Sequence, residues 1–301
     1  MYLSIDFEDF AHDLKRDLGL WETGPLRLDA LWQSYLTIDA FLARHGGPDG
    51  RRATFFCTGV IADQAPDLIA RIAGDGHEIA CHYHFHDEMD RQDVPTVTRM
   101  LARARDALEA ASGQPVRGFR APKFRIDRSA PDQYRAVAAI FGYDSSFPTG
   151  DLAELAAFRR AAGLGDFPIL PIFAGRFRGK GPALRLGGTY LKLFPQAVAH
   201  DLVAQARGAG FAPHIYLHPY EFAADGRYTL SATERRPLGW RKAAYWGLRQ
   251  AQWNRIGNDG LSGKLAALIG AGGLAGRLDR DLAAASGAVP DAVSGTLSGA
   301  P

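Results

Sequence analysis

Short apolar segments alternate with amphipathic stretches along the first 220 residues, and this alternation constrains the fold more than any other feature. The short segments are rich in β-branched and aromatic side chains, which is typical of buried strands. The longer stretches repeat apolar residues every three or four positions and often end at glycine, which is typical of helices. Repeated strand–helix units predict a parallel sheet with helices outside it, as an open sheet or a barrel. We predict strands at 2–6, 53–57, 77–81, 116–119, 143–146, 169–173 and 213–217, and helices at 28–45, 66–73, 95–111, 130–141 and 195–209.

The composition is that of a globular chain with a substantial core. The chain has 301 residues, of which 47% are hydrophobic. Its formal net charge of +2 is close to balanced, and this argues against a nucleic-acid partner. The two cysteines, Cys57 and Cys81, lie in apolar segments and form no CxxC motif, so we expect buried free thiols.

The distribution of residue types predicts three parts. Residues 1–225 hold the strand–helix units, 226–280 are expected to form a C-terminal helical extension, and the Ala- and Gly-rich segment 281–301 is expected to be disordered. The first twenty residues carry acidic side chains where a secretory signal needs an apolar stretch, and no apolar run is long enough to span a membrane. We therefore expect a cytoplasmic protein.

Two histidines in the segment His82-Tyr83-His84-Phe85-His86 indicate a metal site. His82 and His86 are four residues apart and can point the same way from a single helical turn. A carboxylate from the segment Asp6-Phe7-Glu8-Asp9 can complete a set of three ligands, which leaves a position open for water. Both segments follow a predicted strand, and the carboxyl ends of parallel strands collect functional residues. His77 and His214 begin their strands, so we assign them structural roles.

Two further polar segments also follow predicted strands. They are Arg120-Ala121-Pro122 and His218-Pro219-Tyr220-Glu221. Asp144 lies at the end of another strand. Together with the carboxylates and histidines, these segments predict one site at the carboxyl edge of the sheet.

In this order, the four segments resemble the polysaccharide deacetylases, the NodB-like carbohydrate esterase family 4, over roughly residues 1–222. The Asp-x-Glu-Asp start, the segment Gly187-Gly188-Thr189-Tyr190 and the His-Pro-x-Glu end are similar to a cytoplasmic branch associated with exopolysaccharide and capsule gene clusters. The resemblance implies a distorted (β/α) barrel and metal-dependent N-deacetylation of sugars.

The resemblance also implies roles for five residues. Asp6 matches the catalytic base, and Arg120 matches the arginine that holds this base. His218 matches the histidine that protonates the leaving amine. The backbone N–H of Lys123 lies where the family has an oxyanion donor, and Asp144 matches the acidic residue that orients the acid.

One departure from the family affects the metal ligands. Most members have adjacent aspartates, the base and then a ligand, but here Phe7 occupies the second position. In an extended chain Asp6 and Glu8 face the same side, so Glu8 is the expected ligand beside the histidine pair, and Asp9 is the alternative. We expect one divalent ion, with zinc preferred over Co, Ni, Mn and Fe. His84 is expected to line the site without binding the metal.

Several alternatives remain at this stage. The expected partner is an N-acetylated glycan or a lipid-linked sugar. The same set of strand-end residues also occurs in two other kinds of protein, another C–N hydrolase (allantoinase-like or a deformylase) and a non-catalytic glycan-binding module, and both stay open. The basic, aromatic segment 235–256 either packs its tryptophans on the barrel or contacts the inner face of an anionic membrane peripherally. The pair Gly187-Gly188 forms a plain turn or lets the backbone approach a sugar closely.

Overall fold

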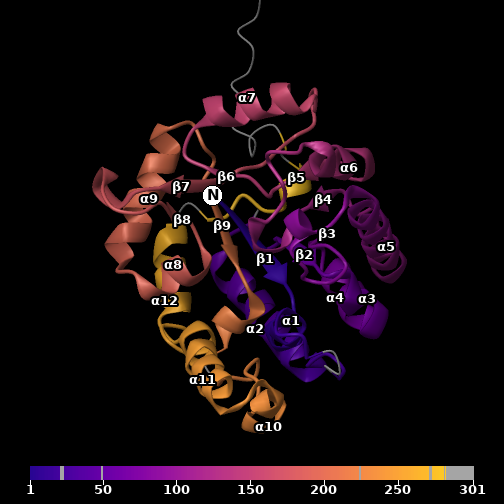
Figure 1. Cartoon of the computed structure of the whole chain (residues 1–301). Coiled ribbons are helices and arrows are strands. Elements are labelled where there is room, and N and C mark those ends of the chain that lie inside the picture. Colours follow the sequence, from indigo (N-terminus) through magenta and orange to yellow (C-terminus); the bar gives the residue numbers. More distant parts are fainter. Residues whose placement is uncertain (21–23, 49, 224, 271–272, 281, 283–301) are drawn as a thin grey trace, which may run out of the picture.

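A curled sheet of six parallel strands forms the centre of the computed structural model, which describes residues 1–20, 24–48, 50–223, 225–270, 273–280 and 282 (Figure 1). The strand order is β5-β4-β3-β2-β1-β9. The strands are β1 (Tyr2–Phe7), β2 (Thr54–Cys57), β3 (Glu78–Cys81), β4 (Gly118–Phe119), β5 (Tyr143–Asp144) and β9 (His214–Leu217). The predicted disordered tail at 281–301 lies, apart from residue 282, outside the described residues.

A smaller sheet closes the barrel between the two edge strands. It contains β6 (Pro148–Thr149), β7 (Ile172–Gly175) and β8 (Leu184–Arg185). Parallel bridges join Asp144 of β5 to Ile169, and Gly187 to Tyr216 of β9. The ring of strands is therefore complete but irregular on this side, and the expected distorted (β/α) barrel is confirmed.

Gly187 makes this closure possible. Its φ is +140°, and a Cβ atom at this position would lie 2.2 Å from the carbonyl oxygen of Tyr216. Only glycine allows two backbones to approach so closely in this conformation. Gly187 thus allows a close approach of two backbone segments, but the partner is the backbone of β9 and not a sugar.

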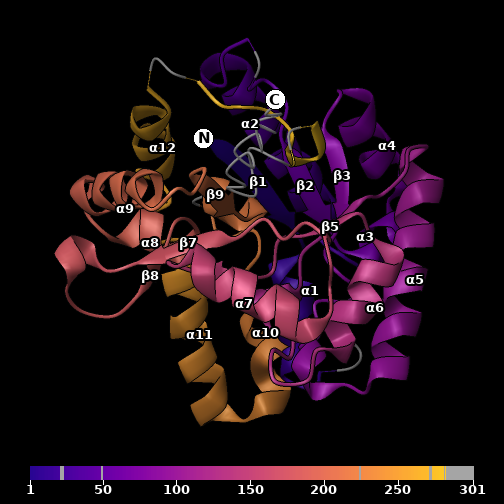
Figure 2. The ribbon, with the colours of Figure 1, turned by 90° about the horizontal axis from the view of Figure 1, so that it is seen from above.

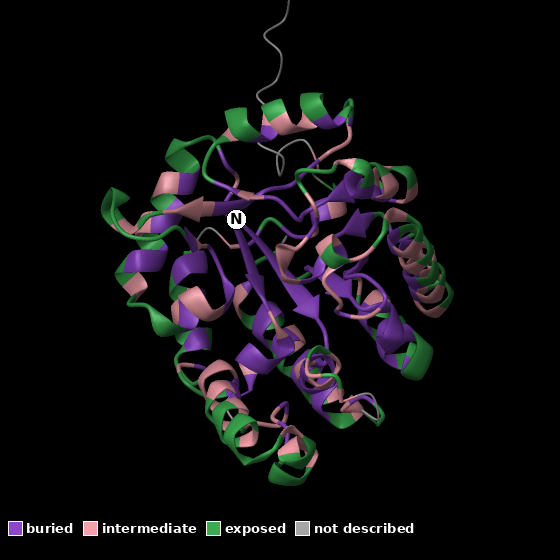
Figure 3. Cartoon of the chain, viewed as in Figure 1, coloured by how far each residue is buried: buried purple, intermediate pink, exposed green. Residues whose placement is uncertain are grey.

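Helices surround the sheet on the outside (Figure 2). They are α1 (Phe10–Asp17), α2 (Leu28–His45), α3 (Gly59–Gln64), α4 (Pro66–Gly74), α5 (Val94–Ser112), α6 (Asp132–Ile140), α7 (Leu152–Ala162), α8 (Gly188–Leu193), α9 (Gln196–Gly208), α10 (Ala232–Arg235), α11 (Trp240–Asn254) and α12 (Leu261–Ile269). Helices α2, α5 and α9 each bury a largely apolar stripe and expose the opposite face (Figure 3). None of the helices in the described part of the chain has the length and hydropathy that a membrane span needs.

The predicted strands and long helices are all present, with small shifts at their ends. The helix predicted at 28–45 has these bounds, whereas the strand predicted at 169–173 is found at Ile172–Gly175. Cys57 and Cys81 are buried free thiols, as expected. Helices α1, α3, α7 and α8 were not predicted. Helix α1 has only eight residues, which is shorter than the stretch over which an apolar periodicity can be recognised.

The segment after β9 returns to the barrel. Helix α12 buries Leu265 and Leu268, and it contacts α2, α8 and α9. Further on, the backbone N–H of Leu278 donates to Oγ1 of Thr54 in β2 at 2.9 Å. The proposed boundary between a barrel at 1–225 and an extension at 226–280 stays a prediction, but helices of the extension pack on the barrel.

Candidate metal centre and active site

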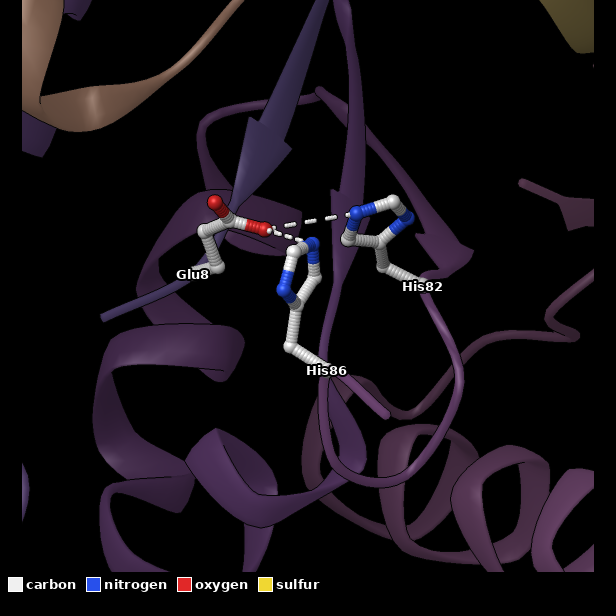
Figure 4. Close-up of side chains that lie close together, drawn as sticks. All are labelled: Glu8, His82 and His86. Atoms are coloured by element: carbon white, nitrogen blue, oxygen red, sulfur yellow. Dashed lines mark ion pairs between the residues drawn. The ribbon is translucent and has the colours of Figure 1, made fainter. Parts of the chain in front are cut away.

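Three side chains converge where β1 and β3 end (Figure 4). Oε2 of Glu8 lies 2.8 Å from Nε2 of His86 and 3.4 Å from Nε2 of His82. The three candidate ligand atoms lie within 4.8 Å of one another, and all three residues are buried. Two imidazole nitrogens and one carboxylate oxygen suit zinc and other divalent first-row metals. The residues predicted from the sequence are therefore brought together in an arrangement that fits one cation.

Burial alone would raise the pKa of Glu8. The charge of His86 and the hydrogen bonds from both histidines outweigh burial and lower this pKa well below its usual range. Glu8 is consequently ionised at neutral pH, which is the form that binds a cation.

The loop after β3 orients His82. Its Nδ1 donates to the carbonyl oxygen of Arg120 at 2.8 Å, which leaves Nε2 directed toward Glu8. Such a hydrogen bond to the second ring nitrogen fixes the tautomer of a metal-binding histidine. The prediction that the two histidines share a helical turn is wrong, because the chain leaves β3 in a loop with Tyr83 at φ +65°. The N–H of Gly59 donates to the Tyr83 carbonyl at 2.9 Å and ties this loop to α3.

His84 does not line the site, contrary to expectation. It is fully buried beside the ring of Phe85, with ring centroids 4.5 Å apart, and it packs against Gly59 of α3. Burial lowers its pKa to about 4, so the side chain is neutral and structural.

Asp9, the alternative ligand, has another function in the structure. Its Oδ1 accepts from the N–H groups of Ala11 at 2.9 Å and His12 at 3.2 Å, and its Oδ2 accepts from the N–H of Arg27 at 2.6 Å. Asp9 therefore caps the N-terminus of α1. Glu8 alone of the two carboxylates contacts the histidine pair, which agrees with the strand alternation of β1.

Asp6 is held by a buried arginine. Its Oδ1 lies 2.5 Å from Nη1 of Arg120, which also donates to Oγ of Ser4 at 2.8 Å. Nη2 of Arg120 donates to Oγ of Ser145 at 2.9 Å, and the guanidinium lies 4.0 Å from the ring centroid of Phe56. The guanidinium is completely buried and its donors are used, so the orientation of Asp6 is fixed by charge-assisted bonds.

His214 contacts the guanidinium of Arg120 as well. Its Nε2 lies 3.2 Å from Nη2 of Arg120 and 2.8 Å from Oγ of Ser4. Burial, followed by the charge of Arg120, lowers the pKa of His214 well below its usual range, so the ring is neutral. The structural role predicted for His214 is thus to hold the guanidinium of Arg120. Ser4 was missed, although it lies two residues before Asp6 on the same face of β1.

His218 lies on the other side of Asp6. Its Nε2 is 3.9 Å from Oδ2 of Asp6, and its Nδ1 is 3.1 Å from Oε2 of Glu221. Burial lowers the pKa of His218, but the hydrogen bond and charge of Glu221 raise it more, to about 9. His218 therefore carries a proton at neutral pH.

Glu221, not Asp144, is the acidic residue beside His218. Asp144 accepts from Oγ of Ser146 at 2.5 Å, and this hydroxyl in turn accepts from the N–H of Ala121 at 2.7 Å. Asp144 consequently stabilises the loop after Arg120, and the orienting role implied for it belongs geometrically to Glu221. The signal was present in the His-Pro-x-Glu motif itself, which places an acid three residues after the histidine.

Part of the sequence also matches a known protein family. Residues 35–145 match the family model described as polysaccharide deacetylase. Over this segment, which is just over a third of the chain, the sequence is similar to the polysaccharide deacetylase family. The recognition made from the motifs is therefore confirmed.

Solved structures from three bacteria align with most of the chain. A putative polysaccharide deacetylase from Mycobacterium smegmatis is 20% identical, with 88% of this chain and 90% of that chain covered and a TM-score of 0.49. A family 4 carbohydrate esterase from Streptomyces lividans, in complex with acetate, is 14% identical, with coverages of 89% and 88% and a TM-score of 0.40. A CE4 family pseudoenzyme from Bacillus anthracis is 14% identical, with 93% of this chain and 64% of that chain covered and a TM-score of 0.46. The chain thus spans slightly less than two thirds of the length of the Bacillus protein.

Lys123 lines the cavity that contains the candidate metal ligands. Both Lys123 and Phe124 have left-handed backbone conformations, with φ of +55° and +58°. Such conformations cost free energy in non-glycine residues, and they occur often at functional sites. The Nζ atom of Lys123 pairs with Oδ2 of Asp17 in α1 at 2.7 Å, so the loop after β4 is bonded to α1.

A cavity of about 330 Å³ connects these residues. One wall is polar and contains Asp6, the metal-site residues and His218. A second wall includes Phe10 of α1 together with Trp246 and Trp253 of α11. Sequence reasoning left the position of α11 open. The structure shows that two of its tryptophans face the cavity, whereas Trp240 is 77% exposed.

Proposed function

We propose that this chain is a metal-dependent N-deacetylase that hydrolyses the acetamido group of N-acetylated sugars. The observation that carries the proposal is the placement of Asp6 and His218 beside the Glu8–His82–His86 cluster, at one end of one cavity. A base, an acid and a set of three metal ligands are the groups that amide hydrolysis needs.

Glu8, His82 and His86 would hold one divalent cation, for which zinc is the preferred candidate. When bound, this ion supplies a Lewis acid for the amide carbonyl and lowers the pKa of a bound water toward ~7.

Asp6 would accept the proton of the attacking water. Its carboxylate has one oxygen bonded to Arg120, and Oδ2 is the oxygen nearer to His218. Because the guanidinium fixes the carboxylate, the basic oxygen stays aimed at one point of the cavity.

His218 would donate a proton to the departing nitrogen. An amine cannot leave as an anion, so an acid is required at this step. The pKa of about 9 keeps His218 protonated at neutral pH, and the hydrogen bond to Glu221 fixes the orientation of the ring. The backbone N–H of Lys123 is proposed as the donor to the developing oxyanion, in accordance with the family resemblance.

The substrate is proposed to be a polysaccharide or a lipid-linked glycan precursor. Two other classes have the same pattern: a C–N hydrolase for cyclic amides or formamides, and a glycan-binding module without activity. The hydrogen-bonded pairs Asp6–Arg120 and His218–Glu221 favour an enzyme over a binding module, because a module has no need for a base and an acid that are held so specifically.

Metal content and acetate release test this function. We expect elemental analysis to find about one divalent metal per chain and the wild-type protein to release acetate from N-acetylglucosamine oligomers. His82→Ala should lose both properties, and Gln196→Ala, on α9, is a control that should keep both. Wild-type metal content in both His82→Ala and His86→Ala would show that the ligands are misassigned. Hydrolysis of a cyclic amide or formamide without acetate release would favour the other hydrolase class.

We also propose that the outer face of α11 contacts an anionic membrane surface. Trp240, Tyr245 and Leu248 are 77%, 55% and 65% exposed. Arg241 and Lys242 are exposed beside them, and residues 235–258 contain no acidic side chain. Exposed aromatic residues interspersed with basic ones suit anionic lipid head groups. The cytoplasmic location stays a prediction.

A further inference from the structure

Helices α1 and α11 form a second wall of the cavity that the proposed reaction does not use. Helix α1 follows the metal-site residue Glu8 after a single residue, whereas α11 comes from a part of the chain more than 200 residues later. Phe10 of α1 and Trp246 and Trp253 of α11 line the same cavity as the metal cluster. A wall of this kind is positioned to bind the part of a substrate that does not react.

The aromatic rings form a continuous series that starts at the catalytic histidine. His218 stacks on Tyr220 with ring centroids 4.9 Å apart, and Tyr220 lies 5.0 Å from Phe10. Phe10 is 5.7 Å from Trp253, which is 5.9 Å from Trp246. A pyranose ring has an apolar face of C–H groups that packs on such aromatic surfaces. The series therefore offers a path of sugar-sized surfaces that leads away from the reacting group.

Asp13 supplies an unused polar group on the same wall. It lies on α1, lines the cavity and is only 5% exposed. Its Oδ1 is 3.3 Å from Nδ1 of His12, but its Oδ2 is buried and has no hydrogen-bond partner among the described residues. A buried oxygen without a partner is costly, and this cost calls for an explanation. Sugar hydroxyls are donors that would satisfy it.

Neighbouring polar side chains hold the aromatic wall in place. The guanidinium of Arg249 lies 4.5 Å from the ring centroid of Trp253. After α11, the side chain of Asn258 donates to the backbone carbonyls of Tyr220 and Ala223, each at 2.7 Å. These bonds connect the end of α11 to the segment that carries His218. A pre-organised surface binds a ligand at a smaller entropic cost.

We propose that α1 and α11 build a carbohydrate subsite, with Trp246, Trp253 and Phe10 as the stacking surface and Asp13 as a hydroxyl ligand. The proposal rests on the proposed function, because it takes the substrate to be a sugar. It identifies the preferred substrate class as an N-acetylated oligosaccharide, since a neighbouring sugar unit occupies this wall while the acetamido group lies at the metal cluster.

Binding of the N-acetylglucosamine tetramer tests the subsite. It is measured by titration calorimetry on zinc-loaded Asp6→Asn protein, which is expected to keep the metal without turning the tetramer over at a useful rate, and the further changes are made in this background. Trp253→Ala should weaken binding roughly tenfold, because a stacking surface is lost, and Trp253→Phe should restore most of the affinity. Trp240→Ala is the matched control: it removes a tryptophan from the outer face of the same helix and should leave binding unchanged. Asp13→Asn should weaken binding severalfold while zinc content stays at the wild-type level.

Steady-state kinetics separate recognition from chemistry. We expect Trp253→Ala to raise KM for the tetramer with kcat nearly unchanged, and to have a much smaller effect on the monosaccharide. Equal binding by Trp253→Ala and Trp240→Ala would overturn the stacking surface. Loss of zinc in Asp13→Asn would overturn the role of Asp13 and make it a support of the metal site.

The subsite and the proposed function fail in different ways. If the wild-type protein binds the tetramer and Trp253→Ala does not, but no acetate is released, the subsite stands and the deacetylase proposal fails. If acetate is released and KM is the same in Trp253→Ala and wild type, the deacetylase stands and the subsite fails.

Discussion

The two walls of the cavity are built in opposite ways. On the strand-end wall, Asp6 is paired with Arg120 and His218 with Glu221, and all four are buried or nearly so. On the helical wall, the tryptophans are partly exposed and their side chains are largely apolar. Reactive groups need fixed partners and little water, because these set their protonation and direction. A surface that recognises a substrate needs open apolar area instead. The comparison predicts that changes in the first wall affect kcat and metal content, whereas changes in the second affect KM.

The largest effect is expected for Asp6→Asn. Loss of the base should reduce acetate release by about 10²- to 10⁴-fold, since general-base catalysis typically contributes this much. Zinc content should remain at the wild-type level, because the asparagine removes a base and not a metal ligand. Elemental analysis together with an acetate assay checks both statements. A metal-free Asp6→Asn protein would instead make Asp6 a ligand.

A change in pH dependence is expected for Glu221→Gln. Glu221 is the main group that raises the pKa of His218 to about 9, with the charges of Glu8 and Asp6 adding to it, so neutralisation of Glu221 should lower this pKa. The protonated, active form of His218 is present below its pKa and is lost above it. The alkaline limb of the kcat/KM profile should therefore move to lower pH, and activity should fall more at pH 8 than at pH 6. A bound cation also lowers the pKa of a nearby acid, so the wild-type limb is expected at or below about 9.

A shift of about one pH unit in this limb would reduce activity roughly tenfold on the alkaline side. Asp144→Asn provides the contrast, since Asp144 bonds to Ser146 and not to His218. Its alkaline limb should stay where it is in wild type. An unchanged limb in Glu221→Gln, or a shifted limb in Asp144→Asn, would restore the role that the family resemblance implied for Asp144.

The strand-end wall was largely predictable from the sequence, because it depends on local patterns. Each strand has a recognisable apolar run, and parallel strands bring their carboxyl ends to one edge, so Glu8, His82 and His218 were expected together. The partners of these residues were harder to predict. Which acid contacts His218 depends on the backbone path after β9, and no periodicity distinguishes Glu221 from Asp144.

The helical wall could not be predicted for a different reason. Aromatic residues lie on both faces of α11, so their spacing does not tell which face is buried. Trp246 and Trp253 face the cavity, whereas Trp240 and Leu248 are exposed. Only the packing of Trp253 on Phe10, which is far away in the sequence, decides between the two faces.

Asp9 lies between Glu8 on the strand-end wall and α1 on the helical wall, and the variant Asp9→Ala tests its role there. Loss of this N-cap of α1 should reduce the free energy of unfolding by about 1 kcal/mol, with zinc content unchanged. Asp93→Ala, which removes the exposed N-cap of α5 and a single hydrogen bond, is the control and should lose somewhat less stability than Asp9→Ala. Urea unfolding of the metal-free proteins measures both values. Zinc loss in Asp9→Ala but not in Asp93→Ala would show that Asp9 is a ligand after all.

The smallest effect on catalysis is expected on the outer face of α11, which points away from both walls. Lys242→Ala should weaken co-sedimentation with anionic vesicles about fivefold, since one basic residue near the surface contributes about 1 kcal/mol. Added salt should weaken wild-type binding further. Arg99→Ala, an exposed position on α5, should bind vesicles as wild type does. All these proteins should deacetylate a soluble oligomer at the wild-type rate, because neither residue contacts the cavity.

If the wild-type protein binds no anionic vesicle at low salt, the proposed membrane contact is wrong. In that case the inner face of the same helix keeps its proposed role in binding sugar.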